Sequence, residues 1–442
     1  MTIQLSDHFT YSRLLRFTLP SIGMMIFTSI YTVVDGIFVS NFVGKTPFAA
    51  LNLIWPVIQL MGAVGFMLGT GGSALVARIL GEGRKEQANR VFSLLVYTAV
   101  VSGAVISAVG VVFLRPIAVV LGAEGEMVEL CVLYGRFLLP FTVLFMLQVL
   151  FQSFLVVAEQ PKLGLTVTIA AGAANMVLDA LFVAGFQGGL AGAALATGLS
   201  QTVGGAIPLA YFCSGRNGVL RLGRTGFDGG ALCRTCANGA SEMMSNLSMS
   251  LVSILYNFQL LHFAGEDGVA SYGALMYLNF IFTAVFLGFS LGSAPIVSYH
   301  YGAENHGELH SLFRKSLTVT VACGVAMAAA AWALAERLSG IFVGYDPVLM
   351  AMTERGVRIY APSFLLAGLN IFGSAFFTAL NNGVVSAVIS FLRTLLFQVA
   401  AVLVLPQFLG LDGIWLAVIA AEAMALCVTA AFLVKLRTRY HY

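Results

Sequence analysis

The chain has 442 residues, of which 59% are hydrophobic and only 10% are charged. A soluble domain usually carries about 25% charged residues, so this composition excludes an ordinary soluble protein and indicates a polytopic membrane protein. The net charge of +3 is small and the basic residues lie mostly in loops, so the sequence does not indicate nucleic-acid binding.

The apolar runs are about 20 to 30 residues long, which suits helices that cross a hydrocarbon layer of roughly 30 Å. They lack the alternation of apolar and polar residues that is typical of a membrane β-barrel. We therefore predict an all-α integral membrane fold with twelve transmembrane helices. No cleavable signal peptide is expected, because the first apolar run is too long for one. In chain order, the predicted spans are 13–41, 48–78, 90–114, 128–157, 162–185, 188–213, 232–263, 268–300, 312–335, 349–380, 383–406 and 412–435.

The longest polar break, at 214–231, falls in the middle of the chain. It predicts a linker between an N-lobe of residues 1–213 and a C-lobe of residues 232–442, each with six helices. Most of the Lys and Arg residues lie in loops on the same side as this linker and both termini. By the positive-inside rule, we expect the linker and both termini on the cytoplasmic side of the cell membrane.

The two halves also resemble each other in their glycine landmarks. Three pairs share one and the same offset in residue number: Gly81 and Gly302, Gly135 and Gly356, Gly189 and Gly410. Six spans in each half give both halves the same orientation in the membrane. The pattern therefore predicts a parallel pseudo-twofold repeat about an axis along the membrane normal, a layout common in transporters.

Five polar residues of the first half are predicted to reach one depth from four helices. Asp35 lies deep in the first span, where an acid is costly and by default marks a functional site. Asn175 and Asp179 share one face of the fifth span, because they are one helical turn apart. With a rise of about 1.5 Å per helical residue, Thr197 in the sixth span and Tyr134 near the outer start of the fourth reach a similar depth.

Two carboxylates, an amide, a hydroxyl and a phenol form an oxygen-rich group, which suits Na⁺. The two acids could equally take up and release a proton, so H⁺ and Na⁺ both remain open as the bound cation. The alternative is that Asp35 and Asp179 only satisfy polar groups inside a helix bundle. Because intramembrane acids are rare and usually functional, we favour a cation site.

The second half lacks this acid pair. At the offset that relates the paired glycines, Asp35 corresponds to Tyr256 and Asp179 to Ala400. A different polar site is possible there, formed by Glu242, Arg393 and Glu422. We expect Arg393 and Glu422 to form an internal ion pair, with contact to a substrate or anion as the alternative. Glu242 is either a coupling acid or a carboxylate that the dipole near a helix start favours.

Pro20 lies in the first span, several helical turns before Asp35. A proline inside a helix removes a backbone hydrogen bond and kinks the helix. The residue is therefore either a bending point that responds to Asp35, and so a gating position, or a passive kink.

The sequence resembles the multidrug and toxic compound extrusion (MATE) family of antiporters. The resemblance is carried by Pro20 and Asp35 in the first span, by GTGGSALVARILGEG at 69–83 and by NMVLDALFV at 175–183. The twelve-span plan, the repeat and the segment GLDGIWLA at 410–417 extend it over essentially the whole chain. The resemblance implies a rocker-switch exporter, in which two six-helix lobes form a V-shaped cavity and cation entry drives the exit of small-molecule drugs or toxic organic compounds.

The resemblance also implies roles for individual residues. In the branch of the family with a first-lobe acid pair, the positions of Asp35, Asn175, Asp179 and Thr197 bind the coupling cation, with Tyr134 nearby. Bending at the position of Pro20 has been proposed for that branch. The other branch carries acids in the seventh and tenth helices, and segment 362–380 of the tenth span here has none. We expect no cofactor beyond H⁺ or Na⁺, and a monomer in the lipid bilayer.

Two other functions compete with export. A flippase of pyrophosphate-linked lipids, which shares the broad fold, should place several Arg or Lys residues in its cavity, and only Arg393 sits in the middle of a span. An intramembrane enzyme is not expected, because the sequence contains no HExxH motif. The sequence does not name the exported compound.

Overall fold

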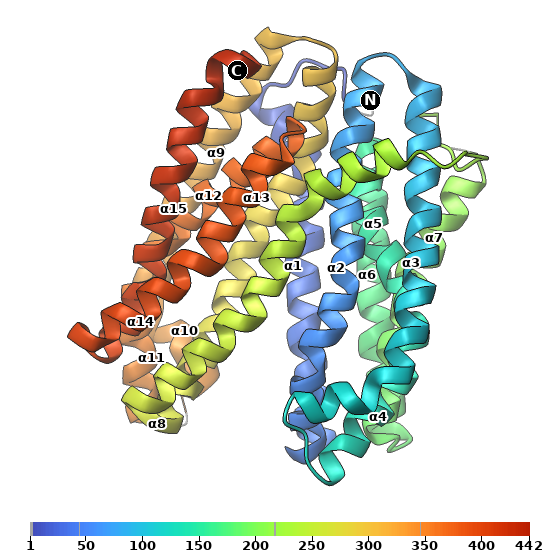
Figure 1. The fold of residues 1–442 in the computed structure, drawn as a ribbon. Coiled ribbons are helices and arrows are strands. Elements are labelled where there is room, and N and C mark those ends of the chain that lie inside the picture. The colour runs from blue at the N-terminus through green and yellow to red at the C-terminus, as the bar shows by residue number, and fades with distance from the viewer. Residues whose placement is uncertain (1–2, 44, 216–217, 345) are drawn as a thin grey trace.

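The computed structural model describes residues 3–43, 45–215, 218–344 and 346–442, and every regular element in them is a helix (Figure 1). The first half contains α1 (Tyr11–Phe42), α2 (Lys45–Gly81), α3 (Lys85–Val120), α4 (Glu126–Leu138), η1 (Leu139–Phe141), α5 (Thr142–Val157), α6 (Pro161–Asp179), η2 (Ala180–Gly185) and α7 (Gly189–Cys213). The second half contains α8 (Gly229–Gly302), α9 (His306–Ala333), α10 (Ala335–Val343), α11 (Pro347–Tyr360), α12 (Ser363–Ala379), α13 (Gly383–Phe391), η3 (Leu392–Leu396), α14 (Phe397–Leu409) and α15 (Leu411–Tyr440).

Within the described residues, eleven helices are long and apolar enough to cross a membrane. The number becomes twelve if α11 and α12, which are bent by 49° relative to each other, form one span. The predicted all-α membrane fold is thus confirmed. α8 contains both the seventh and the eighth predicted spans, which meet at Gly265, where the backbone is not helical and turns with φ 63° and ψ −152°.

Breaks within spans occur at equivalent places in the two halves. The fourth span is interrupted by the 3-10 turn η1, Leu139–Phe141, which contains Pro140. The tenth span is interrupted between Tyr360 and Ser363, where Pro362 lies. These two breaks are related by the same offset in residue number as the paired glycines. The internal repeat therefore extends to the irregularities of the helices.

The helices form two lobes, which Figure 1 shows side by side. The first lobe consists of α1–α7, and the second lobe consists of α8–α15. Both chain termini lie at one end of the molecule, here called the terminal end, where the lobes are close together. Towards the opposite, far end the lobes diverge. The division at 214–231 stays a prediction, and residues 216–217 of that segment lie outside the described residues.

A reciprocal contact joins the lobes at the terminal end. A Cβ atom on Gly81 would clash with the backbone carbonyl of Tyr299, and one on Gly302 would clash with the carbonyl of Arg78. Arg78 and Tyr299 are themselves related by the offset of the paired glycines, so the internal repeat relates the two contacts. Small residues let helix backbones approach closely in membranes. Gly81 and Gly302 therefore mark a place where the lobes touch about their pseudo-twofold axis.

The N-terminal segment before α1 ties the two lobes together at the same end. The Leu5 N–H donates to Glu159 Oε1 of the first lobe at 2.7 Å. The Phe9 N–H donates to Glu308 Oε1 of the second lobe at 2.8 Å, and His8 Nδ1 lies 2.6 Å from the other oxygen of that carboxylate. Leu5 and Phe9 are buried. The segment is thus a packed strap across both lobes, which the polarity of its sequence did not predict.

The outer surface has the apolar character that a lipid environment requires. On α3, Val101, Val105 and Val112 are 64%, 56% and 72% exposed. A row of exposed aliphatic side chains along such a long helix would be unfavourable in water and is favourable in lipid. The protein is therefore a multi-pass membrane protein.

Candidate functional site

The two acids of the first lobe lie next to each other. Asp35 projects from α1, and Asp179 is the last residue of α6. Their carboxylates are close enough to interact, and the Asp179 side chain is fully buried. Within the described part of the chain, both Asp179 oxygens and Asp35 Oδ1 have no hydrogen-bond partner. An unpartnered buried carboxylate is costly, so three such oxygens at one place indicate a site that takes up a positive charge.

The other three predicted residues surround this pair. Tyr134 of α4 is buried, and its hydroxyl lies near both carboxylates and near Thr197 of α7. The Thr197 hydroxyl donates to the Ala193 carbonyl at 3.0 Å, which leaves its oxygen lone pairs available as acceptors. Asn175 lies one turn before Asp179 on α6; it is buried, and its Nδ2 has no partner among the described atoms. The structure thus brings together the group that the sequence predicted.

Two further polar residues join the group on the α1 and α5 sides. Tyr31, one turn before Asp35, is close to that carboxylate and to Gln148 of α5. Gln148 is buried, and its Oε1 has no partner in the described residues. Gln148 was not predicted from the sequence, although it and Gln152 are amide side chains within the apolar run of α5. A polar side chain inside a long apolar helix was the signal that would have found it.

A local change of helix type follows Asp179. Residues Ala180–Gly185 form a π-helical segment, η2, in which the helix is wider than an α-helix. Such segments occur frequently at functional sites. The second lobe has one in its equivalent span, at η3, Leu392–Leu396, and it contains Arg393. Asp179 in the fifth span of the first lobe therefore lies beside a π segment, and Arg393 in the fifth span of the second lobe lies within one.

The first-lobe group offers a cation oxygen atoms only, from carboxylates, hydroxyls and two side-chain amides. Such a set suits Na⁺, because hard cations prefer oxygen ligands. The unpartnered carboxylate oxygens would also accept a proton. Residues Asp35, Asp179, Asn175 and Thr197 therefore fit either cation by their chemistry.

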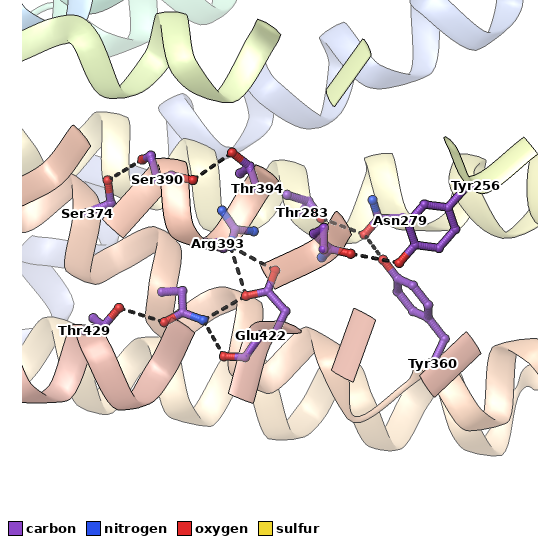
Figure 2. A network of polar contacts seen from close by, with 12 residues as sticks. Tyr256, Asn279, Thr283, Tyr360, Ser374, Ser390, Arg393, Thr394, Glu422 and Thr429 are labelled. Atoms are coloured by element: carbon purple, nitrogen blue, oxygen red, sulfur yellow. Dashed lines mark hydrogen bonds and ion pairs between the residues drawn. The ribbon is translucent and has the colours of Figure 1, made fainter. Parts of the chain in front are cut away.

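The second lobe carries a different polar network, which Figure 2 shows. Arg393 Nε donates to both oxygens of Glu422 at 2.9 Å, so the expected ion pair is present. Asn370 Nδ2 donates to Glu422 Oε2 at 2.8 Å and to the Glu422 carbonyl at 2.9 Å, and Thr429 donates to Asn370 Oδ1 at 2.9 Å. The Glu422 carboxylate is therefore satisfied, in contrast to Asp179.

The positions equivalent to the acid pair contain no acid. Tyr256, the counterpart of Asp35, is buried and donates to Gln398 Oε1 at 2.8 Å. Its ring stacks on that of Tyr272, with centroids 5.1 Å apart. Glu242 lies within electrostatic reach of Arg393, so all three predicted polar residues of this lobe belong to one charged neighbourhood. The two lobes thus differ in charge pattern although they share a fold.

Pro20 is buried inside α1, among the contacts of this helix with the second lobe and before Asp35. Its neighbours Thr18 and Ser21 face the close-packed Gly292 and Gly288 of the second lobe. Its role in gating remains a prediction.

Comparison with known proteins decides the family. The MatE family model matches residues 20–181 and again residues 243–403, which is most of the chain. The chain belongs to the MatE family. The two matched segments lie in the two lobes, as an internal repeat requires.

Relatives and solved structures of this family cover nearly the whole chain. A relative from Staphylococcus aureus strain MRSA252, Multidrug export protein MepA, is 22% identical over 430 residues, which is 96% of this chain and 93% of the relative. A crystal structure of MATE in complex with MaL6 is 23% identical with a TM-score of 0.91, and it covers 98% of this chain and 97% of that one. The outward-facing conformation of a multidrug resistance MATE family transporter of the MOP superfamily is 23% identical with a TM-score of 0.90, over 97% of this chain and 95% of that one. The two-lobe fold is therefore that of the MATE transporters.

Proposed function

We propose that this protein is a secondary active multidrug exporter, which moves organic, often cationic compounds out of the cell in exchange for H⁺ or Na⁺. The observation that carries the proposal is the pair Asp35 and Asp179, which lie together with three unpartnered carboxylate oxygens among the described residues. Membership of the MatE family and the similarity to a protein named for multidrug export support it.

In this proposal the cation binds at the acid pair, where Asn175, Thr197 and Tyr134 complete its surroundings. Entry of one charge down a potential of 100 mV supplies about 2.3 kcal/mol. That free energy drives export only if the cation and the drug prefer different arrangements of the lobes.

Helix α1 provides a physical route for that coupling. Its outer half carries Asp35, and its other half packs Thr18 against Gly292 of the second lobe. A change of charge at Asp35 therefore acts on a helix that also forms the lobe interface. Pro20 lies between these two points and lacks a backbone N–H, so α1 bends more easily there.

We further propose that the terminal end faces the cytoplasm. A rocker-switch motion of the two lobes would then open the cavity between them to one side of the membrane at a time. The positive-inside rule supports this orientation. Close packing at the terminal end together with divergence at the far end is the arrangement expected of an outward-facing state (Figure 1). The protein would act as a monomer in the cytoplasmic membrane.

Dye efflux from cells tests the proposed role of the acid pair. We expect Asp35→Asn and Asp179→Asn each to abolish efflux while the protein remains in the membrane and elutes as a single species. Glu124→Gln, an exposed acid in the turn between α3 and α4, is the matched control and should export normally. Normal efflux by both Asp variants would refute the proposal.

A further inference from the structure

A groove opens at the terminal end of the first lobe, away from the acid pair. Its volume is about 700 Å³. One wall is the start of α3 with the turn that precedes it, and the other is the interlobe segment Thr225–Asp228. The proposed transport mechanism uses none of these residues.

The groove is lined by three cationic side chains, Arg84, Lys85 and Arg90. Arg84 is engaged by Gln87 and Glu82. Lys85 and Arg90 are exposed, and among the described residues neither forms an ion pair.

The acids that line the groove offset only part of this charge. Three cations line it against two acids, Glu86 and Asp228, and the Asp228 carboxylate also accepts the Ala231 N–H at 2.9 Å as the cap of α8. Two further exposed cations, Arg221 and Arg224, lie on the adjoining segment. The groove therefore has an excess of positive charge.

An apolar edge accompanies these charges. Phe227 lines the groove and is 83% exposed, while Val91 and Leu94 of α3 form a buried apolar floor. α3 is a candidate span from Lys85 onwards, so Lys85 and Arg90 lie at its polar end. Cations beside an exposed aromatic ring at the end of a span are typical of the region where lipid headgroups meet water.

The wall formed by the interlobe segment is fixed in place. The Arg221 N–H donates to Asn89 Oδ1 at 2.7 Å, the Gly223 N–H to Ser93 Oγ at 3.0 Å, and the Thr225 hydroxyl to the Arg90 carbonyl at 3.0 Å. Tyr97 donates to the Gly223 carbonyl at 3.1 Å. The groove is thus preformed, and a ligand in it contacts both the first lobe and the segment that leads into α8.

We propose that this groove binds the phosphate headgroup of an anionic phospholipid from the cytoplasmic leaflet, with Lys85 and Arg90 contacting the phosphate and Phe227 lying in the headgroup region. The inference rests on the proposed cytoplasmic position of the terminal end. Basic pockets between helices on the cytoplasmic side suit anionic headgroups, and each cation near such a surface adds about 1 kcal/mol. Loss of two cations should therefore weaken binding about thirtyfold.

Lipid binding to the full-length protein in detergent micelles tests the proposal. The probes are phosphatidylglycerol, phosphatidylcholine and inorganic phosphate, and the readouts are bound lipid by native mass spectrometry and the thermal melting midpoint. We expect phosphatidylglycerol to bind and raise the midpoint of the wild type, with little effect of the other two. Lys85→Gln/Arg90→Gln should weaken this binding about thirtyfold, whereas the control Lys162→Gln/Arg314→Gln, which removes two exposed terminal-end cations elsewhere, should keep it.

Three outcomes would overturn the proposal: equal binding of both lipids, equal loss in both double variants, or an equal effect of inorganic phosphate alone. If Lys85→Gln/Arg90→Gln did not elute as a single species, Arg90→Gln alone would be compared with Lys162→Gln. The test is independent of export, because Asp35→Asn should bind phosphatidylglycerol as the wild type does. Failure of export and failure of lipid binding are thus distinguishable.

Discussion

At the scale of single residues, the two lobes differ in whether a buried carboxylate has hydrogen-bond partners. Asp179 is fully buried, and its oxygens have no partner among the described residues, whereas Glu422 accepts bonds from Arg393 and Asn370. A satisfied carboxylate has little capacity for a further cation, and an unsatisfied one has a strong demand for it. We therefore propose that coupling belongs to the first lobe and that the ion pair of the second lobe has a structural role.

The structural role of the Arg393–Glu422 pair can be tested by stability. Arg393→Ala should lower the free energy of unfolding by about 3–5 kcal/mol, because it leaves Glu422 buried without its partner. Arg393→Met/Glu422→Met should recover most of this loss, since it removes both charges. The measurement is denaturant unfolding in mixed micelles.

Arg115→Ala is the matched control for that experiment. Arg115 also forms an ion pair, with Glu129, but both side chains are largely exposed. Its loss should cost less than about 1 kcal/mol. Equal costs for Arg393→Ala and Arg115→Ala would contradict a structural role for the buried pair.

A second residue-scale prediction concerns Glu159, in the turn between α5 and α6. Burial raises the pKa of its carboxyl, nearby Asp7 raises it further, and the hydrogen bond from the Leu5 N–H acts in the opposite direction. Because the pKa in the folded state lies above the unfolded value, stability is greatest below the unfolded pKa and decreases as pH rises through the folded pKa. Glu159→Gln keeps an oxygen for Leu5 but removes the charge.

We therefore expect Glu159→Gln to raise the thermal melting midpoint at about pH 8 and to leave it unchanged at about pH 3.5. Glu124→Gln, which removes an exposed charge, should change neither value. A lower midpoint for Glu159→Gln at the higher pH would show that the charge stabilises the strap.

At the scale of helices, two of the closest contacts between the lobes lie where α2 meets the C-terminal part of α8. Gly81 and Gly302 each face a backbone carbonyl of the other lobe and leave no room for a Cβ atom. Backbone atoms do not move aside as a flexible side chain does, so a methyl group there must separate the lobes.

Gly81→Ala and Gly302→Ala should each lower the free energy of unfolding by about 1–3 kcal/mol, the usual cost of overpacking. They should also reduce export, because the terminal end can no longer close. Gly273→Ala is the control: it lies in α8, and a Cβ atom there would meet nothing within 4 Å. The idea fails if all three variants behave alike in unfolding and efflux.

Much of this helical scheme could be predicted from the sequence. Apolar length indicated the spans, and equal spacing of glycines indicated the repeat, because both depend on local composition. Polar residues at one depth indicated the cluster of Asp35, Asn175, Asp179, Thr197 and Tyr134, because a straight helix converts residue number into depth.

Other features depend on contacts between distant segments and could not be predicted in this way. The strap of Leu5 and Phe9 over Glu159 and Glu308 is one example, because its sequence is polar and short. The π segment after Asp179 is another, since helix widening leaves no clear mark in composition. Both arise from packing that a single segment does not encode.

At the scale of the whole molecule, the contacts are unevenly distributed along the membrane normal. Gly81, Gly302 and the N-terminal strap join the lobes at the terminal end, and the lobes diverge at the far end (Figure 1). Asp35 of the acid pair lies on α1 beyond Pro20, away from these contacts. A cation that enters from the far end would therefore meet the acid pair while the terminal end is closed.

Drug efflux from proteoliposomes, with a pH gradient or a Na⁺ gradient imposed separately, is the most direct test of this account. We predict that one of the two gradients drives efflux by the wild-type protein, and that Asp35→Asn and Asp179→Asn abolish that response while Glu124→Gln retains it. Gradient-driven efflux that persists in both Asp variants, or efflux that responds to neither gradient, would contradict the assignment of coupling to the acid pair.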